Sequence, residues 1–499
     1  MDTRLEALGI THTDWAATPE SVRLVMLSLL DILQAQSRQI TELQTVVRDL
    51  QARVGQTSRN SSKPPASDPP SAPPAAPRTP RGRKAGGQPG HDGHHRPLVP
   101  PDQVYETIDL HPAGCPHCQT VFPADLPTRG APQRTQVWEL PEIRPQITEY
   151  RQHACCCPTC QQWVTADLPP DAPPGAFGAR ATALMAVLRG RYRVSQDDVV
   201  AFLEDVCAFP ISAASVVTSC DRVSAALEPL DTAIHDTVQA ASMVWVDETS
   251  WPTETRKGWL WVAVCAVATS FRIHASRGRG ALATLLTNLY HGVVHSDRYG
   301  VYRQFPNGQR QLCWAHLVRN LRGLADRYAD ERRWAQTLLA HTDDLFLLWH
   351  LYRGGWIDQV ALQQALIPIR MDIHGLLQTG TTNPYPKLAA FSRDLLAQWD
   401  ALWTFSRVRG VEPTNNAAER ALRHAVLWRK GSFGSRSAAG CRFVERMLSV
   451  HATCLQQERS LFAVVTQAVQ AAWAGTPVPV LIPTCTSGIT LPERHATPA

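Results

Sequence analysis

Three carboxylates in the second half of the chain stand where a sheet could gather them. Asp247 ends the apolar run MVWVD, Asp297 ends the run GVVHSD, and Glu419 lies in the helical stretch TNNAAERALR. Two aspartates on strands and a glutamate on a helix can converge at one sheet edge and hold two divalent ions about 3.5–4 Å apart. One ion would activate a water or a 3′-hydroxyl, and the other would stabilise the oxygen that leaves a phosphodiester. Oxygen ligands favour Mg²⁺ or Mn²⁺ over Zn²⁺.

These carboxylates also have simpler explanations. An aspartate at the end of a strand often caps a turn or a helix, and Glu419 could pair with Arg423 four residues later. Basic side chains beside a carboxylate site nevertheless suit a polyanionic substrate. The basic candidates are Arg319, which with His316 follows Cys313-Trp314 at a strand-to-helix junction, and Arg420, Arg423, Arg429, Lys430 and Arg436. They could equally form an ordinary solvated face.

Four cysteines form a second candidate site. Cys115-Pro-His-Cys118 and Cys157-Pro-Thr-Cys160 are two C-x-x-C pairs with 38 residues between them. Each pair would present two thiolates, and the two pairs together complete the tetrahedral ligand set of a closed, structural Zn²⁺ site. A dithiol redox site would need only one pair. The neighbours that could replace a ligand are Cys155, Cys156, His117 and His153.

A long helix is expected near the N-terminus, with Thr18 as its N-cap and Pro19 at its first position. Apolar residues then recur at alternating spacings of four and three, which is a heptad pattern. The positions are Val22, Met26, Leu29, Leu33, Gln36, Ile40, Leu43, Val47, Leu50 and Val54. The pattern predicts a self-associating coiled coil in which the polar Gln36 could fix the register. The alternative is one amphipathic helix packed on its own protein.

Residues 56–101 contain twelve prolines and almost no apolar side chains, so they cannot bury a core and are expected to be a linker. Their local charge is +5, equal to the net charge of the whole chain. A basic arm of this kind is suited to the phosphate backbone of DNA, with Arg81, Arg83 and Lys84 as candidate contacts. A merely soluble spacer is the alternative.

Composition excludes several classes of protein. Hydrophobic residues make up 44% of the 499 residues, which excludes wholesale disorder. No apolar run approaches the roughly 18 residues needed to span a bilayer, and the N-terminus lacks the layout of a signal peptide. A cytoplasmic protein is therefore expected. Its 13 cysteines should stay reduced, so a disulfide scaffold is not expected.

Several segments, in order, resemble the transposases of insertion-sequence family 66, of the TnpC type. After the two C-x-x-C pairs, they are VDETSW, HSDRYGVY, CWAHLVRN and EPTNNAAERALRHAVLWRKGSFGSRSAAG, and the basic arm adds RNSSKPPASD and RKAGGQPGHDGH. The resemblance covers about residues 20–470. It departs from many members at Thr414-Asn415-Asn416, where they have Asp-Asn-Asn, and at Val318-Arg319, where they have two arginines. Thr414 would still be a suitable N-cap for the helix that follows.

The resemblance implies an RNase-H-like core of the DDE type with a helical insertion. Asp247 and Asp297 match the first and second aspartates, Glu419 the glutamate, and His316 the histidine of the C-W-A-H segment. The resemblance also implies that the N-terminal helix, zinc-binding region and helical region recognise the terminal inverted repeats of the element.

A multidomain α+β/α/β protein is therefore expected. Its segments would be a coiled-coil helix at 18–55, a basic linker at 56–101, a zinc-binding module at 102–170, a helical DNA-binding region at 171–240, a catalytic core at 241–450 with a helical insertion at about 325–405, and a C-terminal helix and tail at 451–499.

The expected function is Mg²⁺-dependent DNA cleavage and strand transfer at element ends, in a protein associated with the nucleoid. The expected partners are double-stranded DNA, a second copy of the chain and, in some elements, accessory proteins; no membrane is expected. A catalytically inactive DNA-binding regulator and a stand-alone nuclease of related fold remain the alternatives.

Overall fold

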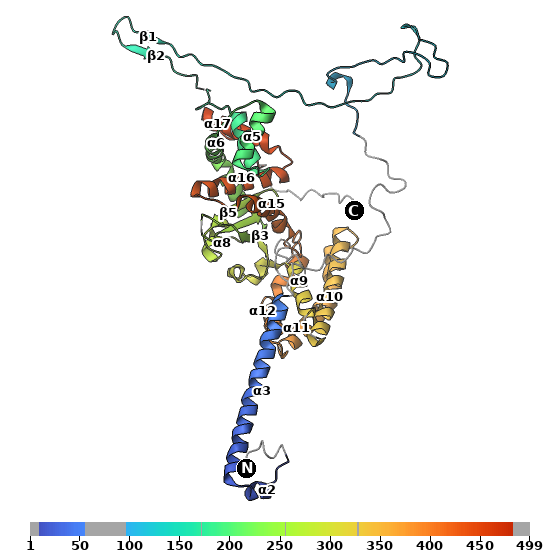
Figure 1. Cartoon of the computed structure of the whole chain (residues 1–499), viewed down its shortest axis with the longest axis vertical. Helices are drawn as coiled ribbons and strands as arrows, with labels where there is room; N and C mark the ends of the chain where they lie inside the picture. Colours follow the sequence, from blue (N-terminus) through green and yellow to red (C-terminus); the bar gives the residue numbers. More distant parts are fainter. Residues whose placement is uncertain (1–8, 55–95, 171, 255, 327–328, 483–499) are drawn as a thin grey trace. The chain divides into compact units, whose positions relative to one another are not determined.

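A computed structural model describes residues 9–54, 96–170, 172–254, 256–326 and 329–482 (Figure 1). The chain divides into two compact units, which are described separately. One comprises Met1–Ala72, Thr148–Glu204 and Pro210–Ala499, and the other comprises Pro73–Ile147 and Asp205–Phe209. Among the helices of the described ranges, none combines the length and the hydrophobicity that crossing a bilayer requires.

A five-stranded mixed sheet, in the order β5-β4-β3-β6-β7, is the centre of the larger unit. β3 (Met243–Ser250), β4 (Trp259–Val264) and β5 (Thr269–His274) form an antiparallel meander. The middle strand of the meander, β4, is a continuous apolar run, WLWVAV, as expected of a strand that is covered on both faces. In β4, all residues after Trp259 are buried.

The other two strands, β6 (Val293–Ser296) and β7 (Arg310–Leu312), extend the sheet parallel to β3. Parallel neighbours need a crossover connection, and α8 (Arg279–Leu285) lies in the one between β5 and β6. The β3–β6 register places Trp245 opposite His295. Two residues farther along, position 247 is still within β3 and pairs with Val262 of β4, whereas position 297 directly follows the end of β6.

Helices that precede the sheet in the sequence, and helices that follow it, pack together around it. α16 covers β5 and also contacts α4, α6, α7 and α17, while α15 lies against β3 and β4 (Figure 1). Residue 450, expected to end the core, lies inside α16. The helices are α4 (Ala179–Gly190), α5 (Gln196–Cys207), α6 (Ala213–Ala226), α7 (Glu228–Gln239), α15 (Asn416–Ser432), α16 (Ala438–Gln456) and α17 (Leu461–Ala474).

The long interval between β7 and α15 is helical, and it includes the insertion expected from the resemblance at about residues 325–405. A hydrophobic cluster joins it to the sheet, with Leu312 of β7 and Trp314 of α9 packed among residues such as Leu366, Phe391 and Trp403. The insertion is therefore continuous with the core of the sheet domain. Its helices are α9 (Trp314–Ala325), α10 (Ala329–Arg353), α11 (Gln359–Gly380), α12 (Pro386–Ala397), α13 (Trp399–Leu402) and α14 (Thr404–Arg407).

The N-terminal helix predicted by the heptad pattern is α3 (Glu20–Val54). Its expected start is wrong, because Thr18 is the C-cap of a preceding short helix, α2 (His12–Ala17), and α3 begins at Glu20. Thr11 and Asp14 form the capping box that starts α2, which sequence inspection missed. Residues 55–95 lie outside the described part of the chain. They include most of the basic linker expected at 56–101, and with it Arg81, Arg83 and Lys84.

The cysteine-rich segment contains little regular structure. A two-stranded antiparallel sheet pairs β1 (Ala154–Cys156) with β2 (Trp163–Thr165) and brackets the second C-x-x-C pair. The sequence VWELPEIRPQITEYRQHA, residues 137–154, alternates in places and predicts a strand or hairpin, but regular structure begins only at its last residue, where Ala154 starts β1.

Candidate active site

The three predicted carboxylates lie on elements that meet at one edge of the sheet. Asp247 is on β3, Asp297 directly follows β6, and Glu419 is in the first turn of α15. The side chain of Asn415 joins α15 to the sheet, because its Nδ2 donates to the carbonyl oxygen of Val246 at 2.8 Å. Asn415 is fully buried, so this bond is shielded from water.

Both ends of α15 are fastened to the β3–β4 region. Beyond its C-terminus, the amide of Ser435 donates to the carbonyl of Pro252 at 3.0 Å, and Trp251 Nε1 donates to Ser435 Oγ at 3.0 Å. Gly434 has φ +103° and lies so close to Pro252 that an added Cβ would be 2.1 Å from its carbonyl oxygen. Glycine is therefore required at this crossing. Glu419 stands on a helix that cannot slide freely along β3.

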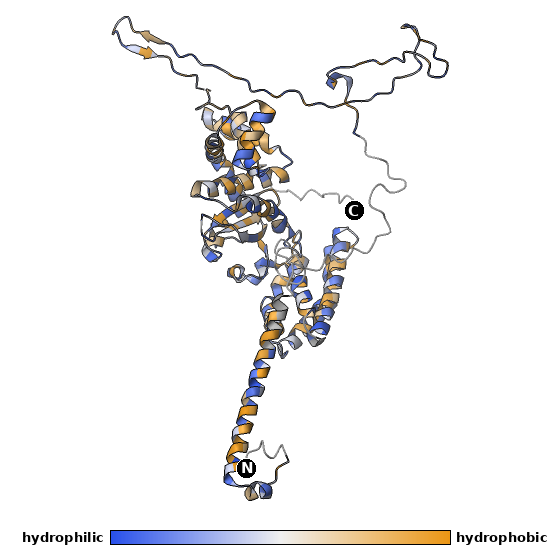
Figure 2. Ribbon diagram, in the orientation of Figure 1, coloured by the Kyte–Doolittle hydropathy of each residue, from blue (hydrophilic) through white to orange (hydrophobic). Residues whose placement is uncertain are grey.

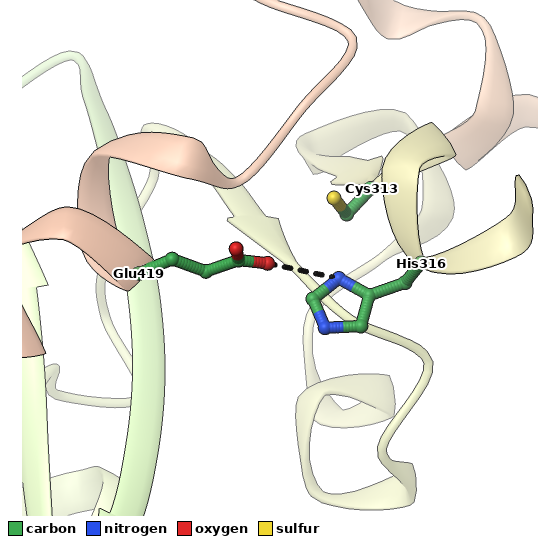
Figure 3. A group of neighbouring side chains, drawn as sticks. All are labelled: Cys313, His316 and Glu419. Atoms are coloured by element: carbon green, nitrogen blue, oxygen red, sulfur yellow. Dashed lines mark ion pairs between the residues drawn. The ribbon is translucent and has the colours of Figure 1, made fainter. Parts of the chain in front are cut away.

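The start of α9 is fastened to the segment before α15. Trp314 donates its amide to Pro413 O at 2.9 Å, and Asn415 donates its amide to the sulfur of Cys313 at 3.1 Å. These bonds bring His316 Nδ1 to 3.5 Å from Glu419 Oε1, as Figure 3 shows.

Arg319, one helical turn after His316, contacts the same carboxylate. Its Nη2 donates to both oxygens of Glu419, at 3.1 and 3.2 Å. Among the described ion pairs, the arginine that pairs with Glu419 is thus Arg319 on another helix, and not Arg423 at i+4. The contact orients the carboxylate towards α9.

Asp247 is the most strongly perturbed of the three acids. Burial raises its pKa well above the ordinary value, and the neighbouring charges of Glu248, Asp297 and Glu419 raise it further. The acids are therefore close enough for the charges of Asp297 and Glu419 to disfavour ionisation of Asp247. A divalent cation would offset that repulsion, so the residues present fit the oxygen-ligated ions that the sequence predicts.

His316 is largely buried beside these acids. Burial and then the charge of Arg319 lower its pKa below the ordinary value of 6.5, while Glu419 and Asp297 act in the opposite direction. The imidazole is therefore neutral near pH 7, which leaves a ring nitrogen free to accept a hydrogen bond or bind a metal ion.

Glu248 is a site residue that sequence inspection missed. Its buried carboxylate accepts bonds from Arg277 Nε at 2.8 Å and Nη2 at 2.6 Å, and from the hydroxyl of Tyr302. Arg277 also stacks on Tyr299, whose amide donates to Asp297 Oδ1 at 2.8 Å. The network holds the segment after Asp297 against β3. An acid beside Asp247 in a buried strand was the available signal.

The start of α15 differs from expectation. The N-cap is Asn415 and not Thr414, and its side chain makes no capping bond because it is committed to Val246. An N-cap side chain normally accepts a hydrogen bond from an amide of the first helical turn. The side chain of Asn415 instead connects the helix to the sheet.

The predicted DNA-contacting residues of α15 fall into two groups. Arg420, Arg423 and Lys430 are exposed, and their spacings of three and seven place them on one face of the helix. Arg429 is partly buried instead and donates to Thr249 Oγ1 at 3.0 Å and Ser250 Oγ at 2.7 Å. Its guanidinium therefore helps to attach α15 to β3. Arg436, beyond the helix, is exposed.

The two C-x-x-C pairs adopt the same local turn. The amide of Gln119 donates to Cys115 O at 2.8 Å, and the amide of Cys115 donates to Thr120 O at 2.9 Å. In the second pair, Gln161 donates to Cys157 O at 2.9 Å, and Cys157 donates to Gln162 O at 2.8 Å. Gln119 and Gln161 both have positive φ, 61° and 55°. The pairs lie in the two different compact units, so each is described by itself.

The raised pKa of Asp247 predicts a pH-dependent cost of folding. Above pH 3.8 the unfolded carboxyl loses its proton before the folded one does. Relative to Asp247→Asn, the wild-type protein should therefore lose stability as pH rises, by up to about 1.4 kcal/mol per pH unit, and level off above the raised folded pKa. Thermal unfolding of both proteins in Mg²⁺-free buffer, from about pH 4 to about pH 8, measures this difference. Parallel pH profiles would contradict the electrostatic account.

Comparisons with known proteins agree with the resemblance. A family model described as "Transposase IS66 family" matches residues 174–442, more than half of the chain. A second model, described as a family of unknown function (DUF6444), matches residues 18–97.

A curated relative from Sinorhizobium fredii, "Uncharacterized protein y4qI", is 24% identical over 266 residues, which are 46% of this chain and 47% of the relative. The chain thus matches about half the length of that protein. The residues matched by the transposase model run through the whole sheet and include all three carboxylates and His316. The chain belongs to the transposase IS66 family.

Proposed function

We propose that the sheet is an RNase-H-like core and that Asp247, Asp297 and Glu419 are its DDE triad. The observation that carries the proposal concerns three acids, which come from β3, the end of β6 and α15. The charges of Asp297 and Glu419 both raise the pKa of Asp247. The strand order supports it, since an antiparallel meander is extended by two parallel strands on the side of β3. The resemblance to DDE enzymes implies the same assignment.

The three carboxylates would hold two Mg²⁺ or Mn²⁺ ions, which when bound supply the nucleophile and stabilise the leaving oxygen of a phosphodiester. The protein's own part is to keep the acids in place. Asn415 positions the start of α15, the network of Glu248 and Arg277 positions the loop after Asp297, and the neutral His316 lies against Glu419. This is catalysis by preorganised charge and not through a covalent intermediate.

DNA would approach along the exposed basic face of α15. Arg420, Arg423 and Lys430 follow Glu419 on the same helix, so phosphates bound there would lie close to the triad. Their contacts would be electrostatic and largely independent of sequence. Recognition of the element ends would depend on the N-terminal helix, the cysteine module and the helical region, as the resemblance implies.

The triad assignment predicts that Asp247→Asn, Asp297→Asn and Glu419→Gln each slow Mg²⁺-dependent cleavage by at least about 100-fold, because each removes charge that stabilises the transition state. Binding of the same DNA should change little. The substrate is a duplex carrying the inverted repeats that flank the gene, and cleavage is followed on denaturing gels with binding measured separately.

Glu458→Gln, an exposed acid beyond α16, is the matched control and should cleave normally. Near-wild-type cleavage by any triad variant would refute the assignment. The products separate the alternatives: joined strands indicate strand transfer, hydrolysed ends alone indicate a nuclease, and binding without cleavage by the wild-type protein indicates a regulator.

We also propose that the two C-x-x-C turns bind one structural Zn²⁺. The proposal is supported by the matching turns, which share their hydrogen-bond pattern and a glutamine with positive φ, because each turn would present two thiolates to one ion. Hydrogen bonds within the turns lower the pKa of Cys118 and of Cys157, which favours the thiolate form that binds metal.

This proposal predicts about one tightly held zinc per chain in purified protein, lost in the Cys115→Ser, Cys118→Ser double variant because a closed site needs all four thiolates. Elemental analysis after dialysis makes the measurement. Cys155→Ser, Cys156→Ser is the matched control, since these thiols lie outside the two turns on β1, and it should retain the metal. Zinc retained by the first variant, or absent from the wild-type protein, would sink the knuckle assignment.

A third proposal is that α3 joins two copies of the chain. Along its predicted seam, Leu29, Leu33, Ile40 and Leu43 are 52–60% exposed in the single chain, and Figure 2 shows hydrophobic residues along the whole helix. In its second half, β-branched residues alternate with leucine in the heptad, a pattern typical of parallel two-stranded coiled coils. Pairing would bring two element ends together.

Leu43→Lys should weaken this pairing strongly, because the seam would then bury a charge on each chain. Mass in solution, measured by light scattering over a range of concentrations, should fall from dimer to monomer. Ala35→Lys, on the same helix but outside the seam, should leave the mass unchanged. A wild-type protein that is already monomeric would contradict the coiled coil.

A further inference from the structure

A thiol, an imidazole and a carboxylate meet beside the proposed triad. Cys313 Sγ, a ring nitrogen of His316 and a carboxylate oxygen of Glu419 all lie within 4.8 Å of one another (Figure 3). Within the described part of the chain, no other group of three or more His, Cys, Asp or Glu side chains meets this criterion, and the three acids of the triad do not meet it as a set. The thiol, the imidazole and the carboxylate are therefore a candidate ligand set that differs from the three acids of the triad.

The spacing fits a single tetrahedral ion. With bonds of about 2.0–2.1 Å to nitrogen and oxygen, tetrahedral ligands lie about 3.3 Å apart. His316 Nδ1 and Glu419 Oε1 are 3.5 Å apart and are not joined by a hydrogen bond, although Nδ1 is buried. A buried nitrogen that lacks a partner requires an explanation, and a bound metal ion would provide one.

The backbone supports each ligand from outside. Cys313 is the N-cap of α9 and His316 is three residues later, so one turn presents both side chains. The amide of Asn415 donates to the sulfur at 3.1 Å, and Arg319 donates to the carboxylate of Glu419. Such outer contacts orient ligands in metal sites.

We propose that Cys313, His316 and Glu419 form a second metal site, selective for a borderline-soft divalent ion such as Zn²⁺. A thiolate and an imidazole favour such ions, whereas Mg²⁺ demands oxygen ligands. Binding releases the thiol proton to solvent and forms the metal–sulfur bond. Three protein ligands leave a fourth position for water.

Occupation of this site has a consequence that rests on the proposed function. Glu419 would then be engaged by Zn²⁺ on the side of α9 and withdrawn from the Mg²⁺ pair held with Asp247 and Asp297. Zinc should therefore inhibit Mg²⁺-dependent cleavage, and loss of the thiol should relieve that inhibition.

The test of the site uses Co²⁺ as a probe of the full-length protein and needs no DNA or activity. A thiolate bound to Co²⁺ gives charge-transfer absorption in the near ultraviolet. Titration of protein whose structural zinc is retained should show this absorption, and Zn²⁺ should displace it. Cys313→Ser should abolish it, and His316→Gln should weaken Co²⁺ binding by at least about 100-fold. Cys220→Ser, a buried thiol on α6, is the matched control and should behave as wild type.

Absorption that is absent in the wild-type protein, or unchanged in folded Cys313→Ser, would overturn the site. If Cys313→Ser does not fold, as judged by circular dichroism, the His316→Gln titration decides the matter, and unchanged affinity would overturn the proposal. Zinc inhibition is then measured on the cleavage substrate. Cobalt binding without zinc inhibition would overturn the competition for Glu419, whereas an inactive wild-type protein that binds cobalt would overturn the proposed function alone.

Discussion

The arrangement of the site depends on how one buried asparagine side chain is held. Asn415 donates from its side chain to β3 and from its backbone to Cys313 at the start of α9, and it also begins α15. Asn415 is 169 residues from its partner on β3 and 102 residues from its partner at the start of α9. It therefore holds β3, α9 and α15 together at a single point. Because the residue is fully buried, losing either bond would leave polar groups without partners, at a cost of roughly 1–3 kcal/mol each.

The anchoring of α15 explains how the helix can hold Glu419 close to other acids that repel it. Glu419 lies near two other acids, and the helix that presents it is anchored at its start by Asn415 and beyond its end by Ser435. Because the helix is anchored, Glu419 remains near Asp247 in the folded protein, where burial and the neighbouring acids raise the pKa of Asp247. The same helix carries exposed basic side chains, of which Arg423 and Lys430 follow Glu419 by four and eleven residues and therefore lie close to its face.

The site also contains two kinds of ligand around one carboxylate. Asp247 and Asp297 offer only oxygen, whereas Cys313 and His316 offer sulfur and nitrogen, and Glu419 stands between the two sets. Hard and soft ions would therefore compete for the same side chain. Arg319 holds that side chain on the side of α9.

The sequence by itself determined the local features. Apolar runs that end at Asp247 and Asp297 identified β3 and β6, heptad spacing identified α3, and residue types identified the acids and the cysteine pairs. Tertiary structure alone decided the parallel register that puts Asp247 and Asp297 at one edge, the pairing of Glu419 with Arg319, and the use of Asn415 and Arg429 as ties. The reason is physical: periodicity and residue type report which face of an element is buried. A contact between residues 100 or more positions apart depends instead on chain crossings that no local pattern records.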